Sequence, residues 1–232
     1  MSKKKILIIA AHPDDEILGA FSYMNNNDYE TQTIFVCEGS SARFMFRESS
    51  DLLDEAIASR QLAALSVAKV LKNNPPIFLN FMNLTLASLP IIEINQKIEP
   101  LIRSFKPNII ITHTKLCNNS DHAMVSNSVN SIVRSNKYPN VELILNMEIP
   151  SSTEQLWGSN FTPNHFVTLN DIDIERKIDL LSLYGDELQN DPGPRSAFGI
   201  RAYAAFRGVS SGSKYAESFK IMRSISRNGD VN

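Results

Sequence analysis

Residues 5–16 read KILIIAAHPDDE, an apolar run followed at once by one imidazole and three carboxylates. The run Lys5–Ala10 has the isoleucine-rich composition of a strand buried within a parallel sheet. A strand that ends in His-Pro-Asp-Asp brings His12, Asp14 and Asp15 to one edge of the sheet, where a metal ion or a reacting water can be held. This stretch therefore indicates both a fold class and the place of a candidate site.

The first two thirds of the chain repeat this alternation between short apolar runs and longer amphipathic ones. Further strands are predicted at Thr33–Cys37, Ile77–Phe81, Asn108–Thr112 and Val141–Met147. Helices are predicted at Ser49–Leu71, Ile91–Phe105, Asp121–Arg134 and Asp171–Leu188. Such alternation is typical of helices packed on a parallel sheet. We expect an α/β fold with a Rossmann-like, mostly parallel β-sheet and helices on both faces.

Two local signals refine the first two long helices. Ser49 or Ser50 is placed to cap the helix that ends at Leu71, because a serine hydroxyl accepts from a free backbone N–H of the first turn. Pro100 lies inside the next helix, where it removes a backbone donor. We therefore expect Pro100 to kink that helix or split it in two.

The segment Asp191–Gly208 does not continue the alternation of short apolar and longer amphipathic runs. Pro192 and Pro194 fix an extended loop, which is predicted to present Arg195 to a ligand. An apolar segment follows as far as Gly208. The sequence shows no repeat and no linker that divides it, so residues 1–232 are predicted to form a single domain.

Composition excludes several classes of function. The 23 basic and 25 acidic residues include no basic run, so no nucleic-acid partner is expected. No apolar run approaches the roughly 20 residues of a membrane span, and the run after Lys5 fits a first strand better than a signal peptide. Cys37 and Cys117 are too few for a disulfide framework. A reducing, cytoplasmic location is expected.

Three of the four histidines follow predicted strands, and their spacing suggests a metal site. His12 and Asp15 lie three residues apart at a helix start, and the fold can bring His122 to the same ion. Two histidines and one carboxylate with an open position form the ligand set of a catalytic zinc, and Asp14 would be the base on the bound water. The alternative is that Asp14, Asp15 and Glu16 only favour a helix N-terminus through its dipole.

Residues Ala11–Glu16 resemble the AHPDDE signature of the PIG-L and LmbE-like deacetylases. These are zinc hydrolases that remove the acetyl group from N-acetylglucosamine-type sugars. The resemblance extends over nearly the whole chain. Within the family, the chain is similar to the bacterial branch often found with surface-polysaccharide genes. Its further matches are Thr112–His113, Asn119–His122, Glu148–Thr153, Pro163–Asn164 and Pro194–Ser196.

The resemblance implies roles for individual residues. His12, Asp15 and His122 are expected to bind zinc, or another divalent ion, with Asp14 as general acid and base. Residues expected to bind the substrate are Arg60, Asn119 and Arg195. Two alternatives remain open at this point. Arg60 can instead be an arginine on the helix face that pairs one turn away, and Arg195 can pair with Glu148 or Asp191.

The oxyanion of the reaction needs a second hydrogen-bond donor besides the metal. Many relatives have a histidine three residues before the second zinc histidine, and this chain has Asn119 there. We therefore name His113 as the candidate donor, with Asn119 as the other. The alternative for His113 is a buried imidazole that pairs with Asp121 and keeps the orientation of the ligands.

The expected function is a zinc-dependent hydrolase that removes the N-acetyl group from a small-molecule amino sugar, nucleotide-, lipid- or glycoconjugate-linked. A sugar-binding homologue without turnover and an amidase for another acyl group are the alternatives. Four residues depart from the family pattern around the site, namely Ala63, Asn83, Cys117 and Gly193. These departures leave the ligands and the base intact, so they predict altered specificity more than lost catalysis.

Overall fold

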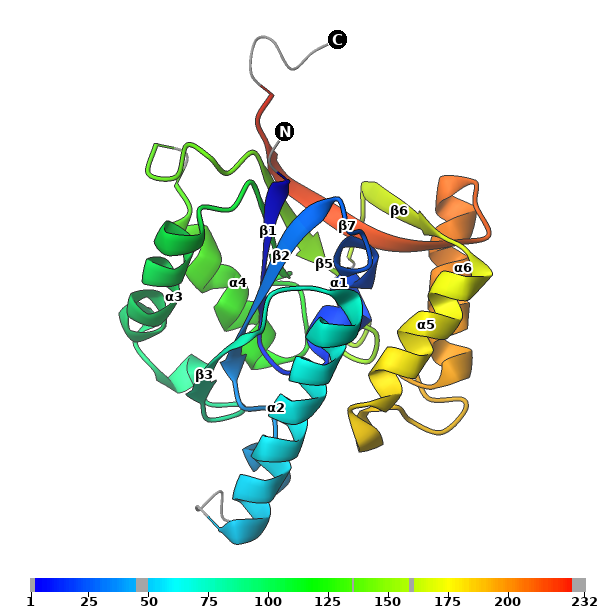
Figure 1. Cartoon of the computed structure of the whole chain (residues 1–232), viewed down its shortest axis with the longest axis horizontal. Helices are drawn as coiled ribbons and strands as arrows, with labels where there is room; N and C mark the ends of the chain where they lie inside the picture. The colour runs from blue at the N-terminus through cyan, green and yellow to red at the C-terminus, as the bar shows by residue number, and fades with distance from the viewer. Residues whose placement is uncertain (1–2, 45–49, 135, 159–160, 227–232) are drawn as a thin grey trace.

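The computed structural model describes residues 3–44, 50–134, 136–158 and 161–226 (Figure 1). The strands are β1 Lys4–Ala10, β2 Tyr29–Cys37, β3 Ile77–Phe81, β4 Ile109–His113, β5 Leu143–Met147, β6 His165–Leu169 and β7 Tyr215–Ser224. The helices are α1 Asp15–Met24, α2 Asp51–Leu71, α3 Ile91–Phe105, α4 Ser120–Ile132, α5 Asp171–Ser182 and α6 Ala197–Ser211. These strands form one sheet in the order β3-β2-β1-β4-β5-β7-β6.

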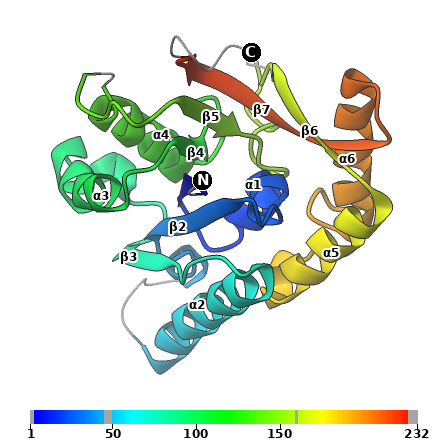
Figure 2. The same cartoon turned by 45° about the horizontal axis from the view of Figure 1, so that its top comes forward.

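The first five strands run parallel, and β7 pairs antiparallel with both β5 and β6. Because side chains alternate along a strand, β1 supplies both hydrophobic cores. Ile6 and Ile8 pack with α1, α2, α5 and α6, whereas Leu7 and Ile9 pack with α3 and α4. Figures 1 and 2 show these two helical layers on opposite faces of the sheet. The predicted mostly parallel α/β fold is confirmed.

Several predicted elements have the observed bounds or differ at one end. The strand Ile77–Phe81 and the helix Ile91–Phe105 occur as predicted, and the helix is not split at Pro100. The long helix predicted to reach Leu188 ends at Ser182, because Gly185 takes a left-handed φ of 60° and begins a separate turn.

The start of α2 is capped by Ser50. Its hydroxyl accepts from the backbone N–H of Leu53 at 3.2 Å. Ser49, the other predicted cap, lies outside the described residues. The predicted strand Thr33–Cys37 was too short, because β2 begins at Tyr29. Its first four residues, Tyr-Glu-Thr-Gln, lack the apolar signal, and all of them except Thr31 are half-buried.

The extended loop predicted around Pro192 and Pro194 ends at Ser196, whose hydroxyl accepts from Gly199 N at 3.0 Å and begins α6. The sequence assigned no secondary structure to the apolar segment that forms this helix. The strands β6 and β7, which the sequence did not predict, lie on either side of α5 and α6 in the chain. They add an antiparallel edge to the parallel sheet.

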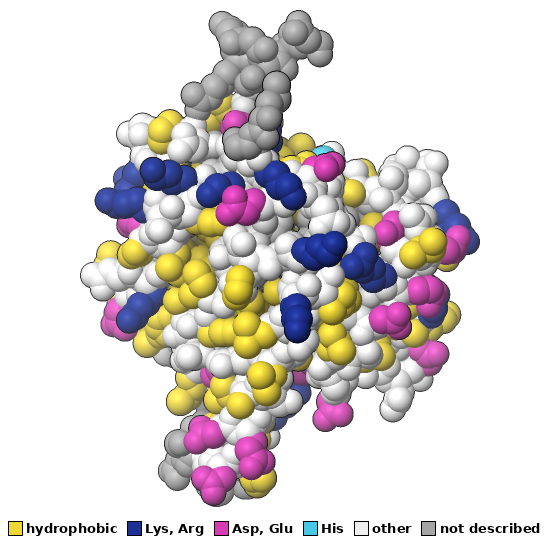
Figure 3. All heavy atoms as spheres, in the orientation of Figure 1, with side chains coloured by type: hydrophobic (Ala, Val, Ile, Leu, Met, Phe, Trp, Pro, Cys, Tyr) yellow, Lys and Arg dark blue, Asp and Glu magenta, His cyan; other side chains and the backbone are white. Residues whose placement is uncertain are grey.

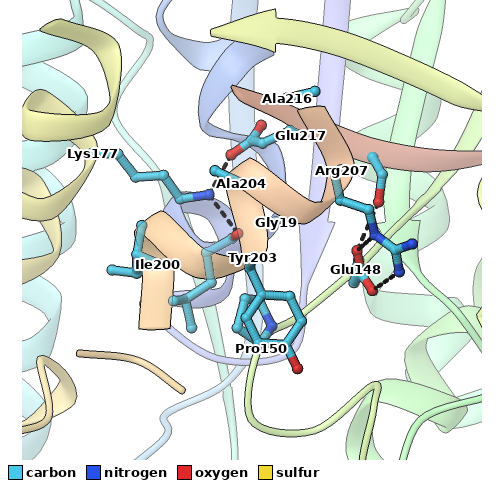
Figure 4. Close-up of a pocket in the computed structure, with 12 residues that line it drawn as sticks. Gly19, Glu148, Pro150, Lys177, Ile200, Tyr203, Ala204, Arg207, Ala216 and Glu217 are labelled. Carbon is cyan, nitrogen blue, oxygen red and sulfur yellow. Dashed lines mark hydrogen bonds and ion pairs between the residues drawn. The ribbon is translucent and has the colours of Figure 1, made fainter. Parts of the chain in front are cut away.

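Helix α1 is interrupted at Ala20, where φ is −140° and ψ is 15°. In a regular helix the N–H of Ser22 would donate to the carbonyl of Leu18. Here Ser22 N donates to Glu217 Oε2 at 2.8 Å, and Leu18 O accepts from Lys177 Nζ at 2.8 Å. Lys177 and Glu217 pair with each other at 2.5 Å (Figure 4). A buried ion pair from α5 and β7 therefore replaces the missing bond of α1.

On the face shown in Figure 3, basic and acidic side chains are mixed with apolar ones. Acidic side chains gather at the lower end, where the protruding helix α2 begins with Asp51 and Asp54 in its first turn. Within the described ranges, no helix has the length and apolar character that crossing a membrane requires.

Candidate active site

A cavity of about 560 Å³ opens at the carboxyl ends of the parallel strands. The strand order reverses between β1 and β4, which is where ligand sites of open α/β sheets form. The residues proposed from the sequence that line this cavity are His12, Asp14, Asp15, Arg60, Asn119, His122 and Arg195. Asp121 and His113 are buried and are not among the residues that line it.

His12, Asp15 and His122 each bring a nitrogen or oxygen atom to a common point. His12 Nδ1 lies 3.2 Å from His122 Nε2 and 3.4 Å from Asp15 Oδ2. His122 Nε2 lies 3.4 Å from Asp15 Oδ1. Ligand atoms about 2.0–2.1 Å from a tetrahedral zinc ion are about 3.4 Å apart from one another. The three buried side chains therefore fit a zinc ion.

The charges in this group favour a cation. Burial opposes the charged form of His12, but the hydrogen bond to Asp121 and the charge of Asp15 outweigh it and raise its pKa to about 9. Burial also opposes charge on His122, yet Asp15 raises its pKa to about 10. The same histidines, foremost His122, overcome the effect of burial on Asp15 and hold its pKa well below the usual value. A site that stabilises positive charge in this way is prepared for a metal cation.

Each of the two candidate histidine ligands has a partner on its other ring nitrogen. Asp121 Oδ2 lies 3.2 Å from His12 Nε2, and the Asp121 carboxylate also accepts two backbone N–H groups from the segment after β3, at 2.6 and 3.2 Å. Cys117 Sγ lies 3.2 Å from His122 Nδ1. Partners of this kind fix the ring and leave the opposite nitrogen for the metal. Cys117, a departure from the family pattern, therefore serves His122 as Asp121 serves His12.

Cys37 forms a second group with metal-ligand spacing, together with His12 and Asp121. The Cys37 thiol donates to Asp121 Oδ2 at 3.4 Å, and burial raises its pKa above the usual range. Since that oxygen also accepts a backbone N–H, this group consists of hydrogen-bonded neighbours of the His12 ring. The group of His12, Asp15 and His122, which lines the cavity, is therefore better suited to a metal ion than the group of His12, Cys37 and Asp121.

Asp14 lies between the candidate ligands His12 and Asp15, directly before α1, with a φ of 130°, a value that non-glycine residues rarely adopt. Its Oδ2 lies 3.2 Å from both Arg60 Nη2 and Arg195 Nη1. Burial raises the pKa of Asp14 to about 7, although Arg60 acts in the opposite direction. A carboxylate with a pKa near neutrality can both accept and return a proton.

Arg60 points into the cavity and not along the face of its helix, so the alternative of a helix-face pair is wrong. Its Nη2 lies 2.7 Å from Glu187 Oε1, and its Nη1 donates to the carbonyl of Gly39. Gly39 takes a φ of 83°, and a Cβ there would lie 2.9 Å from Arg60 Nη1. The positive φ and this close contact both favour a glycine where the arginine passes the β2 loop.

Arg195 also faces the cavity, and the alternative pairing with Glu148 or Asp191 is wrong. Its Nη1 lies 2.6 Å from Glu187 Oε2 and 3.2 Å from Asp14 Oδ2. Glu148 instead pairs with Arg207, whose Nε lies 2.8 Å from it. The extended loop before α6 thus presents Arg195 to the site, as expected from its prolines.

His113 lies behind the ligands. Its ring stacks on His122 with 3.9 Å between centroids, and its Nε2 accepts from the backbone N–H of Ala11 at 2.8 Å. It does not pair with Asp121, which contacts His12 instead. This position is less suited to an oxyanion donor than that of Asn119, which lines the cavity and whose Oδ1 caps α4 by accepting from Asp121 N at 2.9 Å.

Glu187 lines the cavity and is the residue of the candidate site that the sequence did not predict. It is 1% exposed, lies at the end of the turn Gly185–Glu187, and contacts Arg43, Arg60 and Arg195. In the sequence, Glu187 was only one glutamate near the end of the predicted helix Asp171–Leu188, and nothing marked it as part of the site. Of the departures from the family pattern, Asn83 lines the cavity, whereas Ala63 belongs to the hydrophobic core.

Comparison with known proteins places this geometry in context. The profile of the PIG-L family, described as GlcNAc-PI de-N-acetylase, matches residues 7–133. The solved structure of N,N'-diacetylchitobiose deacetylase from Pyrococcus horikoshii has a TM-score of 0.73 and 20% identity over 99% of this chain and 89% of that chain. No curated protein sequence matches the chain.

Two other solved structures show how widely this fold is used. The A40926 pseudoaglycone deacetylase Dbv21 has a TM-score of 0.74 and 14% identity over 97% of this chain and all (100%) of that one. GalB, the 4-carboxy-2-hydroxymuconate hydratase from Pseudomonas putida KT2440, has a TM-score of 0.70 and 15% identity over 97% of this chain and 99% of that one. At these identities the likeness shows the fold alone, so the reaction must be argued from the family and the site.

Proposed function

The chain belongs to the PIG-L family, whose profile covers residues 7–133, and from this premise we propose that it is a zinc-dependent N-deacetylase. Its proposed substrate is an N-acetylated amino sugar, nucleotide-, lipid- or glycoconjugate-linked, and its products are acetate and a free amine. The observation that supports this most is the meeting of His12, Asp15 and His122 beside Asp14 in one cavity. Two of the three solved structures described above are named as deacetylases, which agrees with the proposal.

Zinc, when bound, supplies a Lewis acid that polarises the acetamide carbonyl and lowers the pKa of a water ligand toward about 7. Asp14 takes the proton of the attacking water and later gives it to the departing amine nitrogen. Arg60 and Arg195, each 3.2 Å from Asp14 Oδ2, hold this carboxylate in the cavity. The protein therefore positions one group for both proton transfers.

Asn119 is the better-placed donor for the developing oxyanion. It lines the cavity, and while its Oδ1 caps α4, its amide nitrogen remains available as a donor. A preorganised donor of this kind contributes roughly 10²- to 10³-fold to the rate. In this proposal His113 supports the ring of His122, on which it stacks.

The test is acetate release from a panel of N-acetyl amino sugars and their conjugates, with zinc and with a chelator. We expect release that requires the metal, with free amine formed in equal amount. Asp14→Asn should still bind zinc and should lose activity by orders of magnitude.

Three results would overturn the proposal or replace it. Normal turnover by Asp14→Asn would contradict the role of Asp14 as the base. Release of a different acyl group, with acetyl substrates untouched, would favour an amidase. Sugar binding without release from any substrate would favour a homologue that has lost turnover.

A further inference from the structure

The outer face of α2 carries exposed leucines, although a helix that packs only on its own chain usually has polar side chains there. Leu62 and Leu65 are 63% and 41% exposed, whereas Ala63, Ala64 and Val67 belong to the hydrophobic core. Figures 1 and 2 show α2 on the outside of the molecule, and its first turns protrude below the sheet in Figure 1. The helix therefore has one face on the core and a second apolar face towards solvent.

Neighbouring elements border this outer face on both sides and leave it open. Towards β3, Gln61 Nε2 donates to Asn80 Oδ1 at 2.9 Å. Towards α5, Arg176 Nη2 donates to the carbonyl of Val70 at 3.4 Å. Leu62 and the other outward residues between these two contacts are exposed. The flanks of the helix are thus held by the fold, and the face between them is available to a partner.

Seven exposed positions along this face have the spacing of the a and d positions of a coiled coil, alternately four and three residues apart. A helix with this repeat keeps one line of side chains towards a partner helix over its whole length, here about 30 Å. We call these positions the α2 seam, and its members are Asp51, Glu55, Ala58, Leu62, Leu65, Lys69 and Lys72.

The charges of the α2 seam are segregated along the helix. Asp51 and Glu55 lie at its start, and Lys69 and Lys72 lie at its end. When two copies of the seam run antiparallel about a two-fold axis at Leu62, Asp51 of each copy faces Lys72 of the other. In the same register Glu55 faces Lys69. A parallel pair would instead bring like charges together, so the seam is complementary to itself only in the antiparallel arrangement.

The helix dipole alone does not explain this arrangement. It favours acidic residues in the first turn and basic residues in the last turn, and its effect fades beyond them. Glu55 lies after the first turn, and the dipole gives no reason for the exposed Leu62 and Leu65 between the charged ends. No side chain of the described residues forms an ion pair with Glu55 or Lys69. These two charges are therefore available to pair with another molecule.

We propose that α2 forms the interface of a symmetric homodimer, in which the α2 seams of two copies pack antiparallel. The leucines meet near the two-fold axis, and the charged ends pair on either side of it. The inner side of the same helix carries Arg60 into the candidate active site, so the dimer steadies the helix that positions this arginine. No step of the proposed reaction depends on the dimer, and the inference goes beyond the proposed function.

Sedimentation velocity of the full chain over a range of concentrations tests this. We expect a monomer–dimer equilibrium that weakens with added salt, because salt screens the exposed charges at the ends of the seam. Leu62→Gln should raise the dissociation constant about tenfold, since both copies lose the apolar side chain at the axis. Leu52→Gln is the matched control, because Leu52 lies on the same helix, is 69% exposed and is outside the seam. It should dimerise like the wild type.

Charge reversals test the pairing of the ends. Glu55→Lys and Lys69→Glu each bring like charges together in the antiparallel dimer, so each alone should raise the dissociation constant about tenfold. The double variant Glu55→Lys/Lys69→Glu should dimerise again, because its two ends are once more complementary. Far-UV circular dichroism checks that each variant keeps its helices.

Three results would overturn the inference. One is a wild-type chain that remains a monomer up to about 0.1 mM. Another is a dimer that Leu62→Gln weakens no more than Leu52→Gln does, which would show that the copies meet through a different surface. The third is a double charge reversal that dimerises no better than the single ones, which would exclude the antiparallel pairing of Glu55 with Lys69.

Discussion

At the residue scale, Asp14 combines a costly backbone conformation with a central place in the site. Its φ of 130° is a value that only glycine adopts without strain, and such outliers cost of order 1–3 kcal/mol. The conformation of Asp14 accompanies an arrangement in which its neighbours His12 and Asp15 both face the proposed metal position. The loop geometry therefore serves the site at the expense of stability.

The strain at Asp14 predicts a difference in stability between two variants of this residue. Asp14→Gly and Asp14→Asn both remove the carboxylate, so both should lose activity. Asp14→Gly should nevertheless have a free energy of unfolding about 1 kcal/mol higher than Asp14→Asn, since glycine accepts the positive φ. Denaturant unfolding measures the difference, and equal stabilities would contradict the strain.

Asn119 allows its two roles to be separated. Asn119→Asp keeps an oxygen that caps α4 but loses the amide donor, so its stability should remain near that of the wild type while kcat falls roughly 100-fold. Asn119→Ala should lose both the donor and about 1 kcal/mol of capping. Paired unfolding and steady-state measurements check this, and an Asp variant with normal kcat would exclude Asn119 as the donor.

At the element scale, the kink of α1 depends on Lys177 and Glu217, which replace a helix hydrogen bond (Figure 4). Lys177→Met leaves Glu217 as a buried charge without its cation and frees the Leu18 carbonyl. We expect a loss of about 3–5 kcal/mol of unfolding free energy. Adding Glu217→Gln should recover part of this loss, because no unpaired charge remains.

The control for that prediction is Lys214→Met. Lys214 pairs with Asp171 at 2.5 Å, but both side chains are about two-thirds exposed, at 64% and 67%. Exposed pairs contribute about 0–1 kcal/mol, so this variant should be close to the wild type. If Lys177→Met cost no more than Lys214→Met, the ion pair would not support the kink.

The elements also show where sequence reasoning was sufficient. The strand before His12 and the helix Ile91–Phe105 have strong local patterns and were predicted closely. Helix α6 was not predicted, because the prolines before it and the glycines Gly199 and Gly208 within it weaken the helical pattern, although Ser196 is a residue type that often caps a helix. Glu187 could not be predicted, because it contacts Arg43, Arg60 and Arg195. These lie 144, 127 and 8 residues from it in the sequence (187 − 43, 187 − 60 and 195 − 187), and only the tertiary fold brings them together.

At the scale of the whole molecule, His165 links pH to stability. It is half-buried on β6, with Nε2 2.8 Å from the Tyr23 hydroxyl of α1, and burial lowers its pKa below 6.5. The unfolded chain then binds a proton more readily than the folded one. This contribution to stability is complete above the unfolded pKa of about 6.5 and is lost as the pH falls from there through the lower pKa of the folded chain.

The free energy of unfolding should therefore fall between pH 7.5 and 5.5 with a steeper slope in the wild type than in His165→Gln. The remaining histidines titrate in both proteins, so the difference between the slopes isolates His165. Identical slopes would show that His165 titrates alike in the folded and unfolded chain.

The whole fold brings His12 and His122, which are 110 positions apart in the sequence (122 − 12), together at the centre of the proposed metal site. Anomalous diffraction at the zinc edge, on crystals grown with zinc, tests it most directly. We predict a single strong peak between His12 Nδ1, the Asp15 carboxylate and His122 Nε2. No peak there, or a peak among His12, Cys37 and Asp121 instead, would contradict the proposed metal centre.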